Sequence, residues 1–202
     1  MSTISTKIGP ADHGRRMSLA EFEHAEVQDG YLYELGRGVI VVSEVPNPWH
    51  FLIVNLVSRQ LRAFDLAHPD QFLAIGGGAE CKILVDALGS ERHPDLAVYK
   101  TPPPRNDSGA WSVWVPELVI EVVSSGSRRR DYEEKPEEYL RFGVQEYWIV
   151  DVERQELHVF SRDEGRWAEQ VIGAEGTYRT GLLPGFEFAC GPVFQAARDA
   201  EG

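Results

Sequence analysis

The sequence predicts an α/β fold with a central sheet that helices cover on both faces. Residues 116–152 give the clearest indication, because two apolar runs flank a charged segment there. In the first run, residues 118–123, both alternating sets of positions are apolar, which is typical of a strand buried on both faces. The second run is residues 147–150. The charged segment between the two runs has the length of a short helical crossover, so we expect parallel strands.

A single carboxylate, Glu121, interrupts the first apolar run. A carboxylate in a strand covered on both sides is costly to bury unless it is paired, protonated or bound to a cation. Glu121 is therefore the first residue whose position calls for a chemical explanation.

The N-terminal part predicts a tail, a short helix and a hairpin. Residues 1–16 are polar and have no apolar period, so we expect them to be poorly ordered. Ser18 opens a Ser-Leu-Ala-Glu capping box, which predicts a helix over residues 19–25. Residues 31–34 and 39–42 read as two strands around a glycine turn.

Asn47 and Pro48 mark the start of a longer helix, with Asn47 as the N-cap and Pro48 at the first helical position. Apolar residues at helical spacing carry this helix to about residue 64 or 67. Three strand-like segments follow, at residues 72–75, 79–85 and 93–100. The proline-rich residues 101–109 then predict a loop.

Pro136 lies inside the predicted crossover helix, where a proline removes a hydrogen bond and clashes with an earlier carbonyl. We expect the helix either to begin near Pro136 or to be kinked there, and to end at Gly143. Residues 156–161 and 167–172 predict a hairpin, residues 186–189 an extended segment, and a terminal helix starts from Pro192. Together these elements predict one domain over residues 17–202.

The net charge, the lengths of the apolar runs and the cysteine spacing limit the kinds of protein that this chain can be. The 202 residues carry a net charge of −12, which disfavours broad non-specific adhesion to nucleic acid. No apolar run reaches membrane-spanning length and the N-terminus lacks a secretory pattern, so we expect a cytoplasmic protein. The two cysteines, Cys81 and Cys190, have no metal-binding spacing, and we expect both to be reduced and buried.

Three charged residues form the candidate site. Asp95 starts one predicted strand and Glu121 interrupts another, so the two carboxylates could converge at one edge of the sheet. Hard cations such as Mg²⁺ prefer oxygen ligands of this kind and keep several waters. Lys135 lies on the connecting segment and could return to the same edge, where an ammonium would orient water or neutralise a phosphoryl oxygen.

These residues resemble a known group of enzymes. Pro94-Asp95, the strand with Glu121, and the RRRD-x₃-K-x₃-Y run followed by FGVQEYWIVD are similar to the PD-(D/E)XK nuclease superfamily. More narrowly, they resemble its bacterial "putative restriction endonuclease" family. The similarity covers most of the chain and includes residues 17–22, Tyr33-Glu34 and His50. It implies a restriction-endonuclease-like core with a mixed central sheet, flanking helices and extra β-hairpins.

The resemblance also implies an activity, namely metal-dependent cleavage of DNA by an endonuclease. Asp95 and Glu121 would be the metal ligands, with the backbone carbonyl of Val122 as a third, and Mg²⁺ or alternatively Mn²⁺ as the cofactor. Val123 occupies the position where the superfamily has its lysine, and Lys135 would replace that lysine. Nucleases that cut both strands are often two-fold dimers, so we expect a homodimer.

Further residues could assist the proposed metal ligands and Lys135. Glu34 matches a family carboxylate that could join the site, and His50 is a further auxiliary candidate. A possible strip for substrate phosphates is formed by Arg128, Arg129 and Arg130.

Each of these residues also has a purely structural interpretation. Asp95 could be a turn or cap residue, and Glu121 could pair with an arginine of the 128–130 run. Lys135 could be a solvated helix residue paired with Asp131 four positions earlier, and His50 a packed histidine. The three arginines could belong to a mixed, solvated face. Two other functions therefore stay open: a non-catalytic binding or regulatory module with a nuclease fold, and a hydrolase of another phosphoester.

Overall fold

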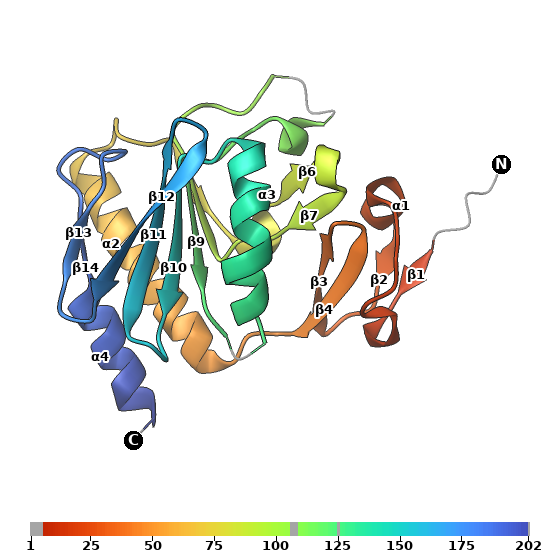
Figure 1. Cartoon of the computed structure of the whole chain (residues 1–202), viewed down its shortest axis with the longest axis horizontal. Helices are drawn as coiled ribbons and strands as arrows, with labels where there is room; N and C mark the ends of the chain where they lie inside the picture. The colour runs from red at the N-terminus through yellow and green to blue at the C-terminus, as the bar shows by residue number, and fades with distance from the viewer. Residues whose placement is uncertain (1–5, 106–108, 125, 202) are drawn as a thin grey trace.

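A computed structural model describes residues 6–105, 109–124 and 126–201 of the chain. At its centre is a six-stranded mixed sheet with the strand order β12-β11-β10-β9-β8-β5 (Figure 1). Strands β9 and β10 are parallel, and every other neighbouring pair in this sheet is antiparallel. The strands are β5 (Ala74–Gly76), β8 (Leu96–Tyr99), β9 (Leu118–Val122), β10 (Glu146–Asp151), β11 (Glu156–Asp163) and β12 (Arg166–Gly173).

Helices cover both faces of this sheet, as predicted. Helices α2 (Pro48–Ala67) and α4 (Cys190–Glu201) lie behind it in Figure 1, and α3 (Lys135–Phe142) lies in front. Strand β9 is buried along its whole length, and its alternate side chains join two different clusters. Ile120 packs in the cluster that holds α2 and α4 residues, whereas Val119 packs in the cluster with Tyr139 of α3. The predicted strand–helix–strand unit is confirmed.

A second, four-stranded sheet lies beside the first, with the order β4-β3-β7-β6. Its strands are β3 (Tyr31–Gly36), β4 (Val39–Glu44), β6 (Ile83–Val85) and β7 (Ser90–Arg92). The predicted hairpin over residues 31–42 is therefore confirmed. Two small sheets pair β1 (Lys7–Ile8) with β2 (Glu26–Val27) and β13 (Thr177–Arg179) with β14 (Glu187–Ala189).

Helix starts follow the capping signals in the sequence. Ser18 Oγ accepts the backbone N–H of Glu21 at 3.3 Å and opens α1 (Leu19–Glu23). Asn47 Oδ1 accepts the N–H of His50 at 2.9 Å at the start of α2. No helix within the described ranges combines the length and apolarity needed to cross a membrane.

The N-terminal segment differs from the expectation of a poorly ordered tail. Residues 1–5 lie outside the described ranges, but β1 pairs with β2 and Ile8 is fully buried. Ile8 packs with Phe22, Leu35 and Ile40 beside the second sheet. A strand of two residues with one buried side chain leaves no apolar period, so the sequence does not indicate its order.

The strand expected over residues 93–100 is confirmed in shorter form as β8, Leu96–Tyr99. Two strands flank the turn at His93-Pro94-Asp95: β7 belongs to the four-stranded sheet and β8 to the six-stranded sheet. Pro94 cannot donate a ladder hydrogen bond, so the chain leaves one sheet there and enters the other. Asp95 consequently stands at the junction of the two sheets. Both cysteines are buried and free, as predicted.

Candidate active site

One cavity of about 610 Å³ brings the three predicted site residues together. Asp95 reaches it from the turn before β8, Glu121 from the last residue but one of β9, and Lys135 from the first turn of α3. The cavity lies where the two sheets and the start of α3 meet. The structure therefore brings these three side chains to one cavity, as the sequence predicted.

Asp95 is held firmly in place just before the first residue of β8. Antiparallel pairing of Leu96 with Ile120 sets it beside β9, where its Oδ2 accepts the backbone N–H of Val122 at 2.7 Å. Its other oxygen, Oδ1, is 3.2 Å from Nε2 of His50. Gly77 is required here because a Cβ atom at this position would lie 2.1 Å from the backbone oxygen of Asp95. The glycine run that precedes β6 thus lets the chain pack closely against the site.

Glu121 and Lys135 form a buried ion pair. Lys135 Nζ lies 2.9 Å from Glu121 Oε1, and each side chain is only 5% exposed. The same carboxylate oxygen accepts the hydroxyl of Tyr139 at 2.6 Å. Lys135 and Tyr139 are four residues apart on α3, so they face the same side of the helix and grip Glu121 together.

Lys135 has a second partner, Asp131, whose Oδ1 is also 2.9 Å from Nζ. Residues Arg130–Glu134 form a π-helical turn that leads into α3, and the N–H of Lys135 bonds to the carbonyl of Arg130 five residues earlier. Pro136 explains this wider turn, because its ring would clash with the carbonyl four residues before it in a regular α-helix. The helix does not begin at Pro136, because residues 128–129 are already α-helical and the π-helical turn continues without a break into α3. Of the two possibilities stated for Pro136, a helix distorted at the proline is therefore closer.

Burial and charge shift the pKa values of these groups. Burial, followed by the negative charge of Glu121, raises the pKa of Asp95 well above its usual range. Burial also raises the pKa of Glu121 to about 7, although Lys135 opposes this shift. Burial alone would lower the pKa of Lys135, but the carboxylates of Asp131 and Glu121 raise it instead. The site therefore holds a lysine that stays protonated and two carboxyl groups whose surroundings do not fully stabilise the ionised form.

Glu34 lines the same cavity but is engaged elsewhere. Its oxygens accept Arg92 Nη1 at 3.1 Å and the backbone N–H of His93 at 3.0 Å. Burial alone would raise the pKa of Glu34, but the charges of Lys135 and Arg92 lower it to about 2. Glu34 is thus an ionised neighbour of the site, held by the network around Arg92.

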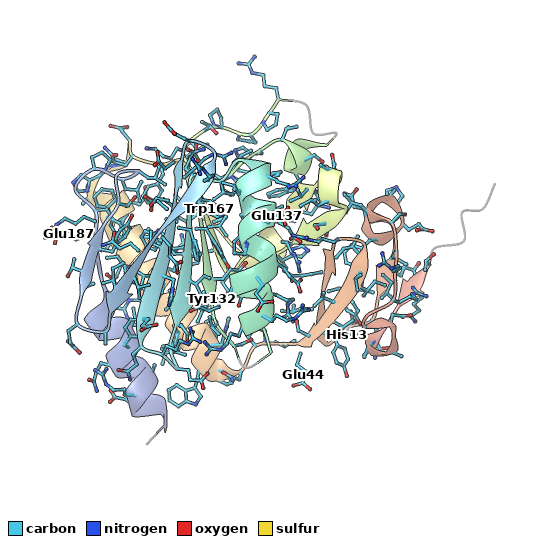
Figure 2. All side chains as sticks on the ribbon, in the orientation of Figure 1. His13, Glu44, Tyr132, Glu137, Trp167 and Glu187 are labelled. Atoms are coloured by element: carbon cyan, nitrogen blue, oxygen red, sulfur yellow. The ribbon has the colours of Figure 1, made fainter. Side chains whose placement is uncertain are left out.

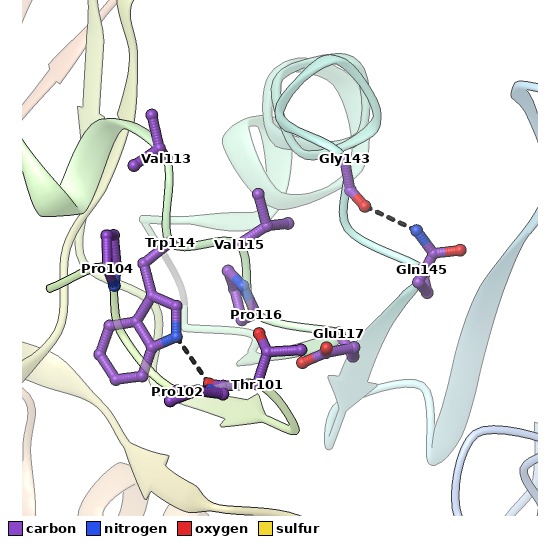
Figure 3. Close-up of a pocket in the computed structure, with 10 residues that line it drawn as sticks. All are labelled: Thr101, Pro102, Pro104, Val113, Trp114, Val115, Pro116, Glu117, Gly143 and Gln145. Atoms are coloured by element: carbon purple, nitrogen blue, oxygen red, sulfur yellow. Dashed lines mark hydrogen bonds between the residues drawn. The ribbon is translucent and has the colours of Figure 1, made fainter.

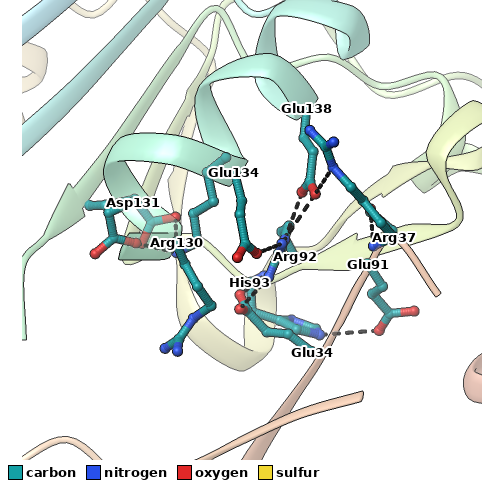
Figure 4. A network of polar contacts seen from close by, with 12 residues as sticks. Glu34, Arg37, Glu91, Arg92, His93, Arg130, Asp131, Glu134 and Glu138 are labelled. Carbon is teal, nitrogen blue, oxygen red and sulfur yellow. Dashed lines mark hydrogen bonds and ion pairs between the residues drawn. The ribbon is translucent and has the colours of Figure 1, made fainter. Parts of the chain in front are cut away.

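Arg92 is fully buried and links three elements (Figure 4). Besides Glu34 of β3, its guanidinium contacts Glu138 of α3 at 2.7 Å and Glu134 of the π-helical turn at 3.3 Å. The network fixes the start of α3, and with it Lys135, against the second sheet. Figure 2 shows Trp167 of β12 near the other side of α3, where its Nε1 donates to the carbonyl of Pro136 at 2.8 Å.

The three arginines of the predicted phosphate strip have different environments. Arg128 pairs with Asp151 and Glu153, and Arg129 pairs with Glu134 at 2.7 Å; neither lines the cavity. Arg130 alone of the three does so. The structure therefore pairs Arg128 and Arg129 with carboxylates away from this cavity, and their contact with substrate phosphates stays a prediction. His50 does line the cavity, beside Asp95.

Two members of the cluster are not among the predicted site residues. Asp131 was expected only as a solvated partner of Lys135, yet its side chain is 1% exposed and lines the cavity. The Asp131-x₃-Lys135 spacing was the one available signal for the first of these. Arg92 has no such signal, because nothing in the sequence around a lone arginine between apolar segments indicates a buried network.

A second hollow of about 600 Å³ lies at the proline-rich loop and has a different character (Figure 3). Its polar groups bond to each other: Trp114 Nε1 donates to the Thr101 carbonyl at 2.9 Å, and Gln145 Nε2 to the Gly143 carbonyl at 2.8 Å. None of the clustered carboxylates lines it. Of these two hollows, the cavity at Asp95 is thus the one that contains the clustered carboxylates and the lysine.

The mixed sheet, the flanking helices and the Asp95–Glu121–Lys135 cluster define a protein of the restriction-endonuclease-like class. The family model described as "Putative restriction endonuclease", Uma2, matches residues 19–191, so the chain belongs to the Uma2 family. A solved structure described as a putative nuclease belonging to DUF820, from Anabaena variabilis ATCC 29413, has the same fold. Its TM-score is 0.72 at 16% sequence identity, over 90% of this chain and 99% of that chain. A search of curated proteins gives no match.

The buried ion pair makes a prediction about stability. Lys135→Gln leaves Glu121 and Asp131 without their ammonium, so we expect a loss of about 3–5 kcal/mol in the free energy of unfolding at pH 8. Burial already raises the pKa values of Asp95 and Glu121, so the folded state takes up protons as pH falls from 8 to 5. The deficit of the variant should therefore shrink at pH 5.

Urea denaturation of both proteins at pH 5 and pH 8 measures this difference. Arg141→Gln is the control, because Arg141 lies on the same helix in an exposed pair with Glu137 and should cost less than about 1 kcal/mol. A deficit for Lys135→Gln that is equal at both pH values would contradict the electrostatic explanation.

Proposed function

We propose that this protein is a divalent-cation-dependent endonuclease that hydrolyses phosphodiester bonds in DNA. One observation carries the proposal: Asp95, Glu121 and Lys135 come from three separate elements and line one cavity. The Uma2 family description and the description of the solved relative both support a nuclease. We further propose Mg²⁺ as the cofactor, with Mn²⁺ as an alternative.

The chemistry of the two carboxyl groups fits a hard cation. Asp95 is partly buried and Glu121 is buried, and the charge of Glu121 helps to raise the pKa of Asp95, so their ionised forms repel each other. A divalent cation between them would remove this repulsion. Val122 offers a third oxygen, since in an extended strand its carbonyl points to the same side as the N–H that bonds Asp95.

Water and substrate would have to complete the coordination. Across the described ranges, no group of three His, Cys, Asp or Glu side chains is arranged to hold an ion unaided. Mg²⁺ commonly binds through one or two carboxylates and keeps several waters, so a two-carboxylate site is compatible with it. When bound, such an ion lowers the pKa of a water and offsets charge on the phosphoryl group.

Lys135 would act as a fixed positive charge. Asp131 and Glu121 both lie 2.9 Å from its ammonium and hold it in the protonated state, so it is not suited to accept a proton at neutral pH. In this role it orients the attacking water or stabilises charge on a phosphoryl oxygen. Tyr139 and Asp131 are positioning residues, because they fix Glu121 and Lys135 respectively.

Cleavage assays test the proposed activity. Asp95→Ala and Glu121→Gln should each lower Mg²⁺-dependent cleavage by at least about 100-fold, because each removes a proposed ligand of the ion. The substrates are supercoiled, linear and single-stranded DNA, with a small phosphodiester beside them. Glu187→Gln, an exposed carboxylate on β14, is the matched control and should cleave like the wild type.

The outcomes separate the alternatives. Equal cleavage by the wild type and both site variants would mean that the activity comes from a contaminating protein or from another site. Cleavage of the small phosphodiester alone would favour a hydrolase of another phosphoester. Mg²⁺ binding without cleavage of any substrate would favour a non-catalytic module.

Metal affinity should depend on pH in a defined direction. Because the pKa of Glu121 is raised to about 7, protons compete with the ion below that pH and the carboxylate is free above it. We expect the affinity for Mg²⁺ in calorimetric titration to weaken about tenfold from pH 8 to pH 6 through this group. Asp95→Ala should abolish the binding; unchanged affinity in that variant, or at both pH values, would contradict the proposed site.

A further inference from the structure

The cavity that holds the acidic cluster also has an apolar wall. Three side chains of this wall are unusually exposed for their type: Val27 (48%), Tyr31 (36%) and Leu32 (43%). They come from β2 and β3, whereas Asp95 and Glu121 come from the six-stranded sheet. Exposed apolar side chains that line a hollow beside reactive polar groups indicate a ligand with both an apolar and a charged part.

Arg130 provides a free positive charge at the same cavity. It is the one arginine among the described residues that line the cavity, and it forms no ion pair with a carboxylate of the described chain. Its Nη1 donates to the carbonyl of Gly126 at 2.9 Å, and its Nε is buried without a partner. A guanidinium in this state is available for a phosphate group.

Arg130 also borders an adjoining hollow, which Arg16 lines as well. Arg16 is exposed and has neither an ion pair nor a side-chain hydrogen bond to any residue the structure describes. The acidic residues of that hollow are mostly occupied, since Glu134 contacts Arg92 and Glu137 contacts Arg37. Two arginines without carboxylate partners among the described residues therefore line the adjoining hollow, and one of them, Arg130, also lines the cavity.

We propose that the site takes single-stranded nucleic acid, with an unpaired base on the wall formed by Tyr31 and Leu32 and a flanking phosphate on Arg130. This rests on the proposed nuclease function and specifies its substrate. In a duplex the bases are stacked inside and present no face to Tyr31, whereas unpaired bases stack readily on aromatic side chains. The net charge of −12 also disfavours a broad electrostatic grip on duplex phosphates.

Binding without hydrolysis tests the proposal directly. Fluorescence anisotropy with Ca²⁺ in place of Mg²⁺ compares a single-stranded oligonucleotide of about 20 nucleotides with the blunt duplex of the same sequence. We expect the single strand to bind at least about tenfold more tightly. Equal or tighter binding of the duplex would overturn the proposal.

Variants at the two proposed contacts give a second readout. Tyr31→Ala should weaken single-strand binding by at least about fivefold through lost stacking, while Tyr31→Phe keeps the ring and should restore it. Arg130→Gln should weaken binding and reduce the slope of log affinity against log salt by about 0.7. Arg166→Gln removes an equal charge from an exposed position on β12 and should leave the slope unchanged.

These outcomes distinguish the substrate from the activity. Single-strand binding that depends on Tyr31 and Arg130, without any Mg²⁺-dependent cleavage, would uphold the binding site and reject the nuclease. Cleavage of duplex DNA that requires Asp95, with Tyr31→Ala binding like the wild type, would uphold the nuclease and reject the single-strand site.

Discussion

The structure of this site depends on a single buried cation. The ammonium of Lys135 lies 2.9 Å from carboxylate oxygens of both Glu121 and Asp131, and all three side chains are almost completely buried. Without it, Glu121 and Asp131 would be buried with no positive charge in contact, because the other buried cation nearby, Arg92, is paired with Glu34, Glu134 and Glu138. The charge of Lys135 offsets part of the cost of burying the Glu121 carboxylate. The pKa of Glu121 is nevertheless raised, so a second positive charge nearby would stabilise its ionised form further.

Several distant parts of the chain serve to place that ammonium. Pro136 widens the preceding turn, so that Asp131 and Lys135 point to the same cavity. Arg92 ties the start of α3 to the second sheet through Glu34 and Glu138. A buried arginine with three carboxylate partners is costly to disrupt, because removal of any one charge leaves others uncompensated. The second sheet therefore contributes to the geometry of the site as well as to the cavity wall.

Local patterns in the sequence predicted much of this arrangement. The apolar runs on either side of α3 predicted the parallel strands, Asn47 predicted the start of α2, and Glu121 stood out because a carboxylate interrupts a strand buried on both faces. The burial of Arg92 was not predictable, since charged residues are normally exposed and its carboxylate partners come from distant segments. Asp131 has its partner Lys135 only four residues away, but that spacing does not show that the pair is buried. The same reason explains Arg128, whose partner Asp151 lies at the end of another strand.

The central claim is that Asp95 and Glu121 grip a divalent ion beside Lys135. Anomalous scattering from crystals soaked in Mn²⁺ tests it most directly, because the signal locates the ion without reference to activity. The account predicts an anomalous peak between the two carboxylates, about 2.0–2.4 Å from an oxygen of each. A peak elsewhere, or none at a saturating concentration with Glu121 still paired only to Lys135 and Tyr139, would contradict it.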